Sequence, residues 1–330
     1  MRNGRRVLSV ENLRVHFPVK KGLLKKTVGH IKAVDGVSFD LWEGKTLGLV
    51  GESGCGKTTV AKAIVRLIGE SRGRIVCRNR NLLELNGREL RRMRSHIQMI
   101  FQDPFSSLDP KKTVGDIIGE PIKFHRPKEN AERLVKTYMQ LTGLREEFYK
   151  RYPHEFSGGQ RQRIGIARAL APQPEIIVAD EPVSALDVSV QAKVLNLMKD
   201  LQRRLKLSYL FITHDLSVVK HISDQIVVMY LGRIVERFDA NAIGKEVVHP
   251  YTKALIACVP VSEPRKRAKR QVLEGEIPSP LNVPKGCCFV TRCPYEIRRC
   301  HEEAPAEEKV REGHSVACHR WKTIGRAETR

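Results

Sequence analysis

The chain has 330 residues, which is long enough for one large domain and a smaller one. Its formal net charge of +22, with 29% charged residues, favours an anionic partner or surface but does not choose among nucleotide, nucleic acid and anionic lipid. No apolar run approaches the roughly 18 residues of a membrane-spanning helix, so we do not expect the chain to cross a bilayer by itself. No signal peptide is evident at the N-terminus, and we expect a cytosolic protein with reduced thiols.

The first predicted elements are strands. Residues 7–15 and 34–41 alternate between apolar and polar side chains, as half-buried strands do, and the basic segment 20–32 separates them. We therefore predict a small β layer ahead of the phosphate-binding motif that follows.

A phosphate-binding motif follows the apolar run 46–50. The pattern G-x-x-x-x-G-K-[ST] is matched by Gly51-Glu52-Ser53-Gly54-Cys55-Gly56-Lys57-Thr58, and a predicted helix continues from Thr59. The glycines allow a tight turn whose N–H groups and helix N-terminus face an anion. Lys57 can reach the β and γ phosphates, and the Thr58 hydroxyl can bind Mg²⁺. The alternative is a glycine-rich surface turn, but the strand before it and the helix after it favour nucleotide.

Gln102 follows the next apolar strand, 97–101. Ligands of open α/β sheets lie beyond the carboxyl ends of the strands, so Gln102 is a candidate contact for a metal ion or an attacking water. The alternative is an ordinary loop glutamine. From residue 113 to 148 the pattern becomes helical.

A second candidate anion site is formed by Ser157-Gly158-Gly159-Gln160. A serine and two glycines at a predicted helix start expose several N–H donors at the positive end of the helix dipole. This site and the phosphate-binding motif need not meet within one molecule.

The predicted buried strand 176–180 ends in two carboxylates, Asp180 and Glu181. Two adjacent buried anions are costly unless a cation is near. Asp180 suits a contact with Mg²⁺, and Glu181 suits a general base for the water that attacks the γ phosphate. The alternative is a solvated acidic pair at a strand end. Asp187 then begins a helix, and the next strand delivers His214, a candidate contact for the γ phosphate.

Cysteines gather near the C-terminus, where Cys287, Cys293, Cys300 and Cys318 follow the spacing C-x5-C-x6-C-x17-C. Four thiolates can hold Zn²⁺ or an iron–sulfur cluster, and spacing alone does not decide between them. Thiols without a metal are the third alternative.

The ordered set of these motifs over residues ~5–245 resembles the ATPase subunits of ABC transporters. The resemblance implies an α/β fold of the P-loop NTPase class. We expect a RecA-like parallel sheet, the N-terminal antiparallel β layer and a helical subdomain at about 105–170 within an ATP-binding domain 1–245, followed by a small Cys-rich domain 246–330. It also implies a head-to-tail dimer in which Lys57 and Thr58 of one subunit face the Ser157 and Gly159 region of the other across ATP.

Further features narrow the resemblance to importers of dipeptides and oligopeptides. These are the segment Phe17-Pro18-Val19-Lys20, the motif His249-Pro250-Tyr251-Thr252 and the C-terminal cysteines. The resemblance implies a heterodimer with a paralogous ATPase, two transmembrane permeases, an extracytoplasmic solute-binding protein and a peripheral place on the cytoplasmic face of the membrane. In this family the four cysteines resemble the ligands of a [4Fe-4S] cluster.

Other classes of function are weighed against this one. A soluble ABC-type ATPase acting on nucleic acid or ribosomes would explain the charge, but it predicts stacking aromatics among basic residues, and only 6% of residues are aromatic. We therefore expect no nucleic-acid partner. A metal-sensing regulator lacks a recognisable DNA-reading helix. The basic linker 264–270 could contact anionic lipid headgroups or be merely solvated.

Overall fold

The computed structural model describes residues 4–22, 26–243, 246–257, 275 and 278–324. The basic linker 264–270 lies outside the described residues. By internal contacts the chain divides into two units. Unit 1 comprises residues 4–9, 40–46 and 76–212, and unit 2 comprises 10–39, 47–75 and the described part of 213–324.

Unit 1 contains three parallel strands in the order β8-β7-β6. Their registers pair Ile97 with Ile176 and Ile176 with Ser208, so the first residues of the three strands are aligned with one another in the sheet. The strands of unit 1 are β5 (Arg80–Asn81), β6 (Ile97–Ile100), β7 (Ile176–Asp180) and β8 (Ser208–Thr213). Every residue of β7 and β8 is buried, as the continuous apolar runs predict for parallel strands covered on both faces.

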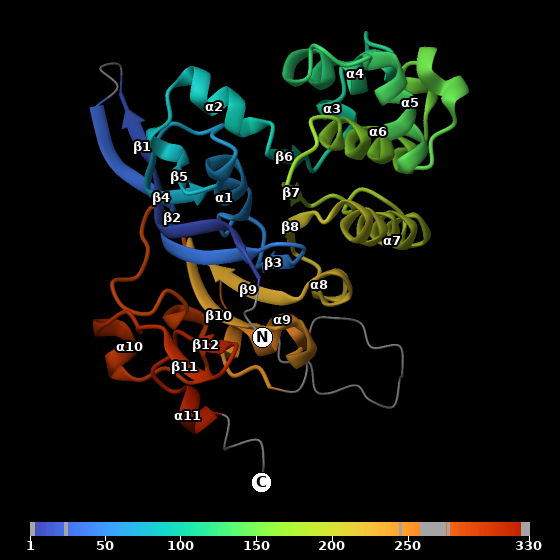
Figure 1. Cartoon of the computed structure of the whole chain (residues 1–330). Helices are drawn as coiled ribbons and strands as arrows, with labels where there is room; N and C mark the ends of the chain where they lie inside the picture. Colours follow the sequence, from blue (N-terminus) through green and yellow to red (C-terminus); the bar gives the residue numbers. More distant parts are fainter. Residues whose placement is uncertain (1–3, 23–25, 244–245, 258–274, 276–277, 325–330) are drawn as a thin grey trace, which may run out of the picture. The chain divides into compact units, whose positions relative to one another are not determined.

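The helices of unit 1 begin at polar caps. Thr113, Asn130, Ser157 and Asp187 each accept a hydrogen bond from a backbone N–H of the first turn. Helices α4, α5 and α6 pack on one another (Figure 1). The helices are α2 (Gly87–Arg94), α3 (Pro104–Ser107), α4 (Val114–His125), α5 (Ala131–Leu141), α6 (Gly158–Leu170) and α7 (Val188–Leu205).

Unit 2 contains a mixed sheet with strand order β11-β12-β10-β9-β3, in which β3 and β9 are parallel and the other pairs are antiparallel. A separate β layer has the order β2-β1-β4. The strands are β1 (Arg6–Lys21), β2 (Lys26–Trp42), β3 (Thr46–Val50), β4 (Ser71–Cys77), β9 (Gln225–Tyr230), β10 (Arg233–Asp239), β11 (Glu308–Arg311) and β12 (His314–Val316). The helices are α1 (Lys57–Ile64), α8 (Leu216–Ile222), α9 (Pro250–Ala257), α10 (Arg298–Glu302) and α11 (Trp321–Ile324).

One expectation about the β layer was wrong. The basic residues around 20–32 are not a separator, because β1 and β2 extend into them on both sides. Strand pairing uses the backbone, and a basic side chain at an exposed position does not interrupt it. Lys20, Lys21 and Lys26 are exposed.

Candidate functional site

The phosphate-binding loop joins β3 to α1 in unit 2, as predicted. All five residues of β3 are buried, and α1 begins at Lys57 with Gly56 as its N-cap. Gly56 has φ +105°, and a Cβ there would lie 2.1 Å from the Ala33 carbonyl oxygen, so this position requires glycine. Since Gly56 has no side chain to cap the helix, the first-turn N–H groups of α1 are those an anion would use.

Lys57 is folded onto its own loop. Its side chain is buried, and Nζ donates to the carbonyl oxygens of Gly51 at 2.7 Å and Glu52 at 2.9 Å. Nζ also lies 3.8 Å from the Cys55 thiol, whose pKa is raised by burial. Lys57 is therefore held at the loop by two carbonyl oxygens and a thiol, and none of these three partners is an ionised carboxylate. Ser53 and Gly54 are exposed, whereas Thr58 and Thr59 are half-buried at the start of α1.

In unit 1 the structure brings Gln102 and Glu181 together. Strands β6 and β7 are parallel with Ile100 opposite Ala179, so the residues that follow them emerge at the same edge. Gln102 Nε2 donates to Glu181 Oε2 at 3.0 Å. No strand periodicity could give this contact, although each residue stands just beyond the carboxyl end of its strand, where ligands of such sheets lie.

Asp180 and Glu181 have different environments. Asp180 is 2% exposed and is the last residue of β7, opposite Ile212. Glu181 is half-buried and has φ +46°, an uncommon backbone conformation for a residue with a side chain, and its N–H donates to the Ile212 carbonyl at 2.9 Å. This left-handed turn directs the chain out of the strand at Glu181. Strain of this kind is often found at functional positions.

The Ser157-Gly158-Gly159-Gln160 motif begins α6 with a reciprocal cap. Ser157 Oγ accepts from the Gln160 N–H at 3.4 Å, and Gln160 Oε1 accepts from the Ser157 N–H at 3.0 Å. A Cβ at Gly159 would lie 2.4 Å from Val190 Cγ1, so the start of α6 packs against α7 only with glycine there. Helix α6 begins at Gly158, because its cap lies at Ser157.

Asp187 and His214 lie beside helix starts. Asp187 caps α7, accepting from the Val190 N–H at 3.0 Å and from Ser189 Oγ at 2.8 Å. The Val190 N–H, followed by the Ser189 hydroxyl, lowers the pKa of the Asp187 carboxyl. His214 belongs to unit 2, where it is exposed between β8 and α8.

Two residues of the C-terminal segment that starts at residue 246, called the tail below, contact the phosphate-binding loop but were not among the predicted site residues. The Tyr251 hydroxyl accepts a hydrogen bond from the Glu52 N–H at 2.8 Å, and Arg292 forms a bidentate ion pair with the Glu52 carboxylate. Tyr251 stands in the family-like motif 249–252, and nothing in the local sequence pattern marks Arg292.

The cysteine prediction is not supported by the described geometry. Across residues 278–324, and in the rest of the described chain, no group of three or more His, Cys, Asp or Glu side chains is arranged to hold a metal ion. The Cys287 thiol instead hydrogen-bonds the Cys288 thiol, which raises the pKa of Cys287. Burial, with a smaller effect of the neighbouring cysteines, raises the pKa of Cys293 to about 12 and that of Cys318 to about 11.

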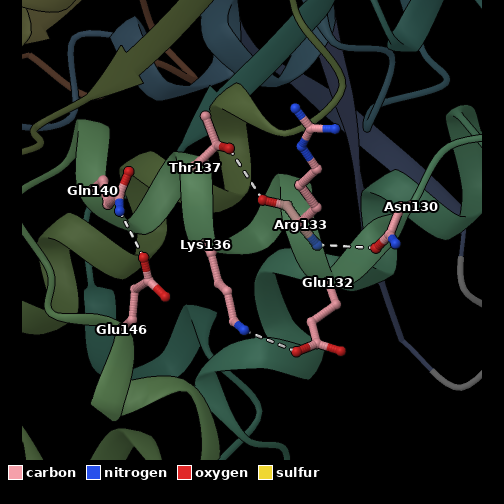
Figure 2. A pocket seen from close by; sticks show the side chains of 7 residues that line it. All are labelled: Asn130, Glu132, Arg133, Lys136, Thr137, Gln140 and Glu146. Atoms are coloured by element: carbon pink, nitrogen blue, oxygen red, sulfur yellow. Dashed lines mark hydrogen bonds and ion pairs between the residues drawn. The ribbon is translucent and has the colours of Figure 1, made fainter.

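A polar pocket of about 480 Å³ lies on α5 and the turn after it, and Figure 2 shows the residues that line it. Its side chains largely bond to one another: Gln140 donates to Glu146 at 2.6 Å, and Lys136 pairs with Glu132 at 3.0 Å. None of the predicted site residues lines this pocket. Among the described helices, none has both the length and the apolarity needed to span a membrane.

Comparison with known proteins agrees with these motifs. Residues 34–184 match the family model "ABC transporter", and residues 235–300 match "Oligopeptide/dipeptide transporter, C-terminal region". The chain is 50% identical to the oligopeptide transport ATP-binding protein AppF of Bacillus subtilis, over 96% of this chain and 98% of that protein. It is also 50% identical to the oligopeptide transport ATP-binding protein OppF of Escherichia coli, over 96% of each.

Solved structures give the same result for the fold. A dimeric ATP-binding cassette in a post-hydrolysis state, bound to ADP and Pi, matches with a TM-score of 0.62 and 27% identity over 71% of this chain and 98% of that chain. The predicted P-loop ATPase fold is therefore confirmed. With near-complete coverage of relatives at about half identity, this chain belongs to the ABC-transporter family of oligopeptide and dipeptide transport ATP-binding proteins.

Proposed function

We propose that the chain is the ATP-hydrolysing subunit that powers import of dipeptides or oligopeptides through an ABC transporter. The observation that carries this proposal is identity of 50% over 96% of the chain with proteins named for oligopeptide transport and ATP binding. The match of the tail to a region specific to oligopeptide and dipeptide transporters supports the same cargo class. ATP hydrolysis supplies the energy, and a change in the shape of the ATPase pair transmits it.

Within this function the phosphate-binding loop holds the triphosphate. Lys57 contacts the β and γ phosphates when it leaves the carbonyl groups of its own loop, and the N–H groups at the start of α1 surround the phosphate oxygens. Thr58, Gln102 and Asp180 are the oxygen ligands offered to Mg²⁺, a donor set that suits this hard cation. The bound ion would neutralise charge on the phosphates.

We assign the general base to Glu181. A base needs to be held in one orientation, and the hydrogen bond from Gln102 does this for one oxygen of the Glu181 carboxylate. Gln102 is then the residue that orients both the base and the water. His214 is proposed to contact the γ phosphate from the end of β8.

The catalytic unit is proposed to be a head-to-tail pair of ATPase subunits. Ser157, Gly158, Gly159 and Gln160 at the N-terminus of α6 contact the nucleotide held by the opposite subunit, with Asp187 beside the same closing surface. The dimeric cassette with ADP and Pi among the structural relatives supports this arrangement. The second subunit is proposed to be a paralogous ATPase, which would make the pair a heterodimer.

The remaining partners follow from the importer class. They are two transmembrane permeases and an extracytoplasmic solute-binding protein, with this chain peripheral on the cytoplasmic face of the membrane. The proposed division is an ATP-binding domain at 1–245, with its helical subdomain at about 105–170, and a C-terminal domain at 246–330. Contact of the basic linker with anionic lipid is part of the same proposal.

For the four tail cysteines an iron–sulfur cluster stays a prediction based on the resemblance, with Zn²⁺ as its alternative. A metal at these residues would bind the thiolates and displace their protons. No step of ATP hydrolysis depends on this group.

The test of the proposed function is reconstitution. The chain, its paralogous ATPase and their permeases are placed in lipid vesicles, with Mg-ATP on the ATPase side and the binding protein on the other. We expect ATP hydrolysis to rise and labelled peptide to cross only when the binding protein carries peptide. Hydrolysis that responds to RNA or ribosomes, and not to loaded binding protein, would refute the assignment.

A further inference from the structure

Two described residues of the C-terminal tail, Tyr251 and Arg292, contact the phosphate-binding loop at Glu52. Arg292 Nη1 lies 2.7 Å from Glu52 Oε2, and Nη2 lies 3.2 Å from Oε1, so the pair is bidentate. The Tyr251 hydroxyl accepts from the Glu52 N–H at 2.8 Å. Side chain and backbone of one loop residue are therefore both fixed by residues about 200 or more positions later in the chain.

Both tail contacts are rigidly supported. Tyr251 is 0% exposed, and its ring lies 4.7 Å from that of Tyr230 and 5.5 Å from that of Phe289. Phe289 also contacts Tyr230 edge-on at 5.2 Å, and it precedes Arg292 by three residues. Aromatic packing of this kind fixes the position of the Tyr251 ring and its hydroxyl, and the Arg292 guanidinium lies 6.0 Å from the centroid of the Tyr230 ring in the same cluster.

The ion pair also changes the charge of the loop. Glu52 places a carboxylate within a segment built to bind a polyanion, and without a partner it would repel the phosphates. The Arg292 side chain is 7% exposed and that of Glu52 is 25% exposed, so water screens this pair only weakly. A bidentate guanidinium neutralises the carboxylate and fixes its direction.

We propose that Arg292 and Tyr251 are positioning residues for nucleotide binding, through which the cysteine-bearing tail keeps the phosphate-binding loop in its ATP-accepting form. The inference rests on the proposed function, since it concerns the affinity of the same loop for ATP. The coupling is reciprocal, so ATP bound to the loop also stabilises the docked tail.

The test measures the Kd of the full chain for Mg-ATP by calorimetry. R292A should weaken binding by roughly 5- to 150-fold, the usual range for coupled sites. Y251F, which removes one hydroxyl from a packed ring, should weaken it by about 2- to 12-fold, as for a single hydrogen bond. The matched control is R298A, since Arg298 lies in the same tail with a side chain 92% exposed and pairs only locally with Glu302. R298A should bind like the parent chain.

A double variant distinguishes a positioning role of Arg292 from a general loss of structure in R292A. If Arg292 acts through Glu52, then E52Q combined with R292A should recover most of the affinity, because the uncompensated carboxylate is gone. Equal affinity of R292A and the parent chain, or no recovery in the double variant, overturns the inference. Should R292A fail to fold, R292K and Y251F carry the test, and parent-like affinity in both overturns it. A parent chain that does not bind Mg-ATP refutes the proposed function instead.

Discussion

Replacing Glu181 by glutamine removes one negative charge and one proton acceptor while keeping the size of the side chain. The hydrogen bond from Gln102, 3.0 Å in length, can be kept because the new side chain still offers a carbonyl oxygen. The left-handed backbone at φ +46° is set by residue position and is unchanged. The substitution therefore isolates the chemical role of the carboxylate from its structural one.

Loss of a positioned general base slows a reaction by about 10² to 10⁴. At about 1.36 kcal/mol for each factor of ten, this raises the barrier by roughly 3 to 5.5 kcal/mol. ATP affinity should not fall, because E181Q removes a carboxylate that would repel the phosphates. We expect a protein that binds ATP, forms the closed pair and hydrolyses it slowly.

The assay combines single-turnover hydrolysis of Mg-ATP with light scattering for the paired state. The matched control is E175Q, since Glu175 lies just before the opposite end of β7, where it pairs with Arg5 and Arg78. E175Q should turn over like the parent chain. If E181Q keeps more than about a tenth of the parent rate, Glu181 is not the base, because such a small loss falls below the expected range.

Three further outcomes are expected. G56A should abolish nucleotide binding, because its Cβ would meet the Ala33 carbonyl oxygen at 2.1 Å with φ at +105°. G54A shares a positive φ, +81°, but has no atom within 4 Å of the added Cβ, so it should retain more binding in the same titration. Burial lowers the pKa of His249 to about 4, so the unfolded chain binds the proton more readily than the folded one. The contribution of His249 to the free energy of unfolding is complete above pH ~6.5, and urea unfolding should show it fall by about 2 kcal/mol at pH 5. H249Q should reduce this loss. Anaerobic purification should give a brown protein absorbing near roughly 400 nm if the family-like cluster forms, and C300S should lose the colour, whereas a colourless parent protein would exclude the cluster.

The catalytic strands could be predicted because their residues are consecutive. Apolar runs at 46–50 and 176–180 have no polar interruption, and both are buried strands. The polar residues beyond strand ends were identified by the same local logic, and Gln102 and Glu181 do meet. The caps at Ser157 and Asp187 were also local signals, since each side chain bonds a backbone group three residues away.

The N-terminal β layer shows where local pattern was insufficient. The concentration of basic residues at 20–32 suggested a segment that separates two strands. Whether a charged residue lies in a strand depends on the strand beside it, and β1 and β2 continue as neighbours in one sheet. For the four cysteines, spacing alone did not decide between a metal and free thiols. Among the described residues no group of three or more His, Cys, Asp or Glu side chains is arranged to hold a metal ion, so the cluster stays a prediction based on the resemblance.

The sequence by itself determined the class of the protein, since a phosphate-binding motif needs only eight consecutive residues and the geometry of a strand, a turn and a helix start. Tertiary structure alone decided which residues support that motif. Tyr251 and Arg292 contact Glu52 from 199 and 240 positions away, and no short-range period relates such residues. Their meeting depends on how the tail packs around Tyr230 and Phe289, because contacts between distant residues are fixed by the folded chain and not by neighbouring sequence.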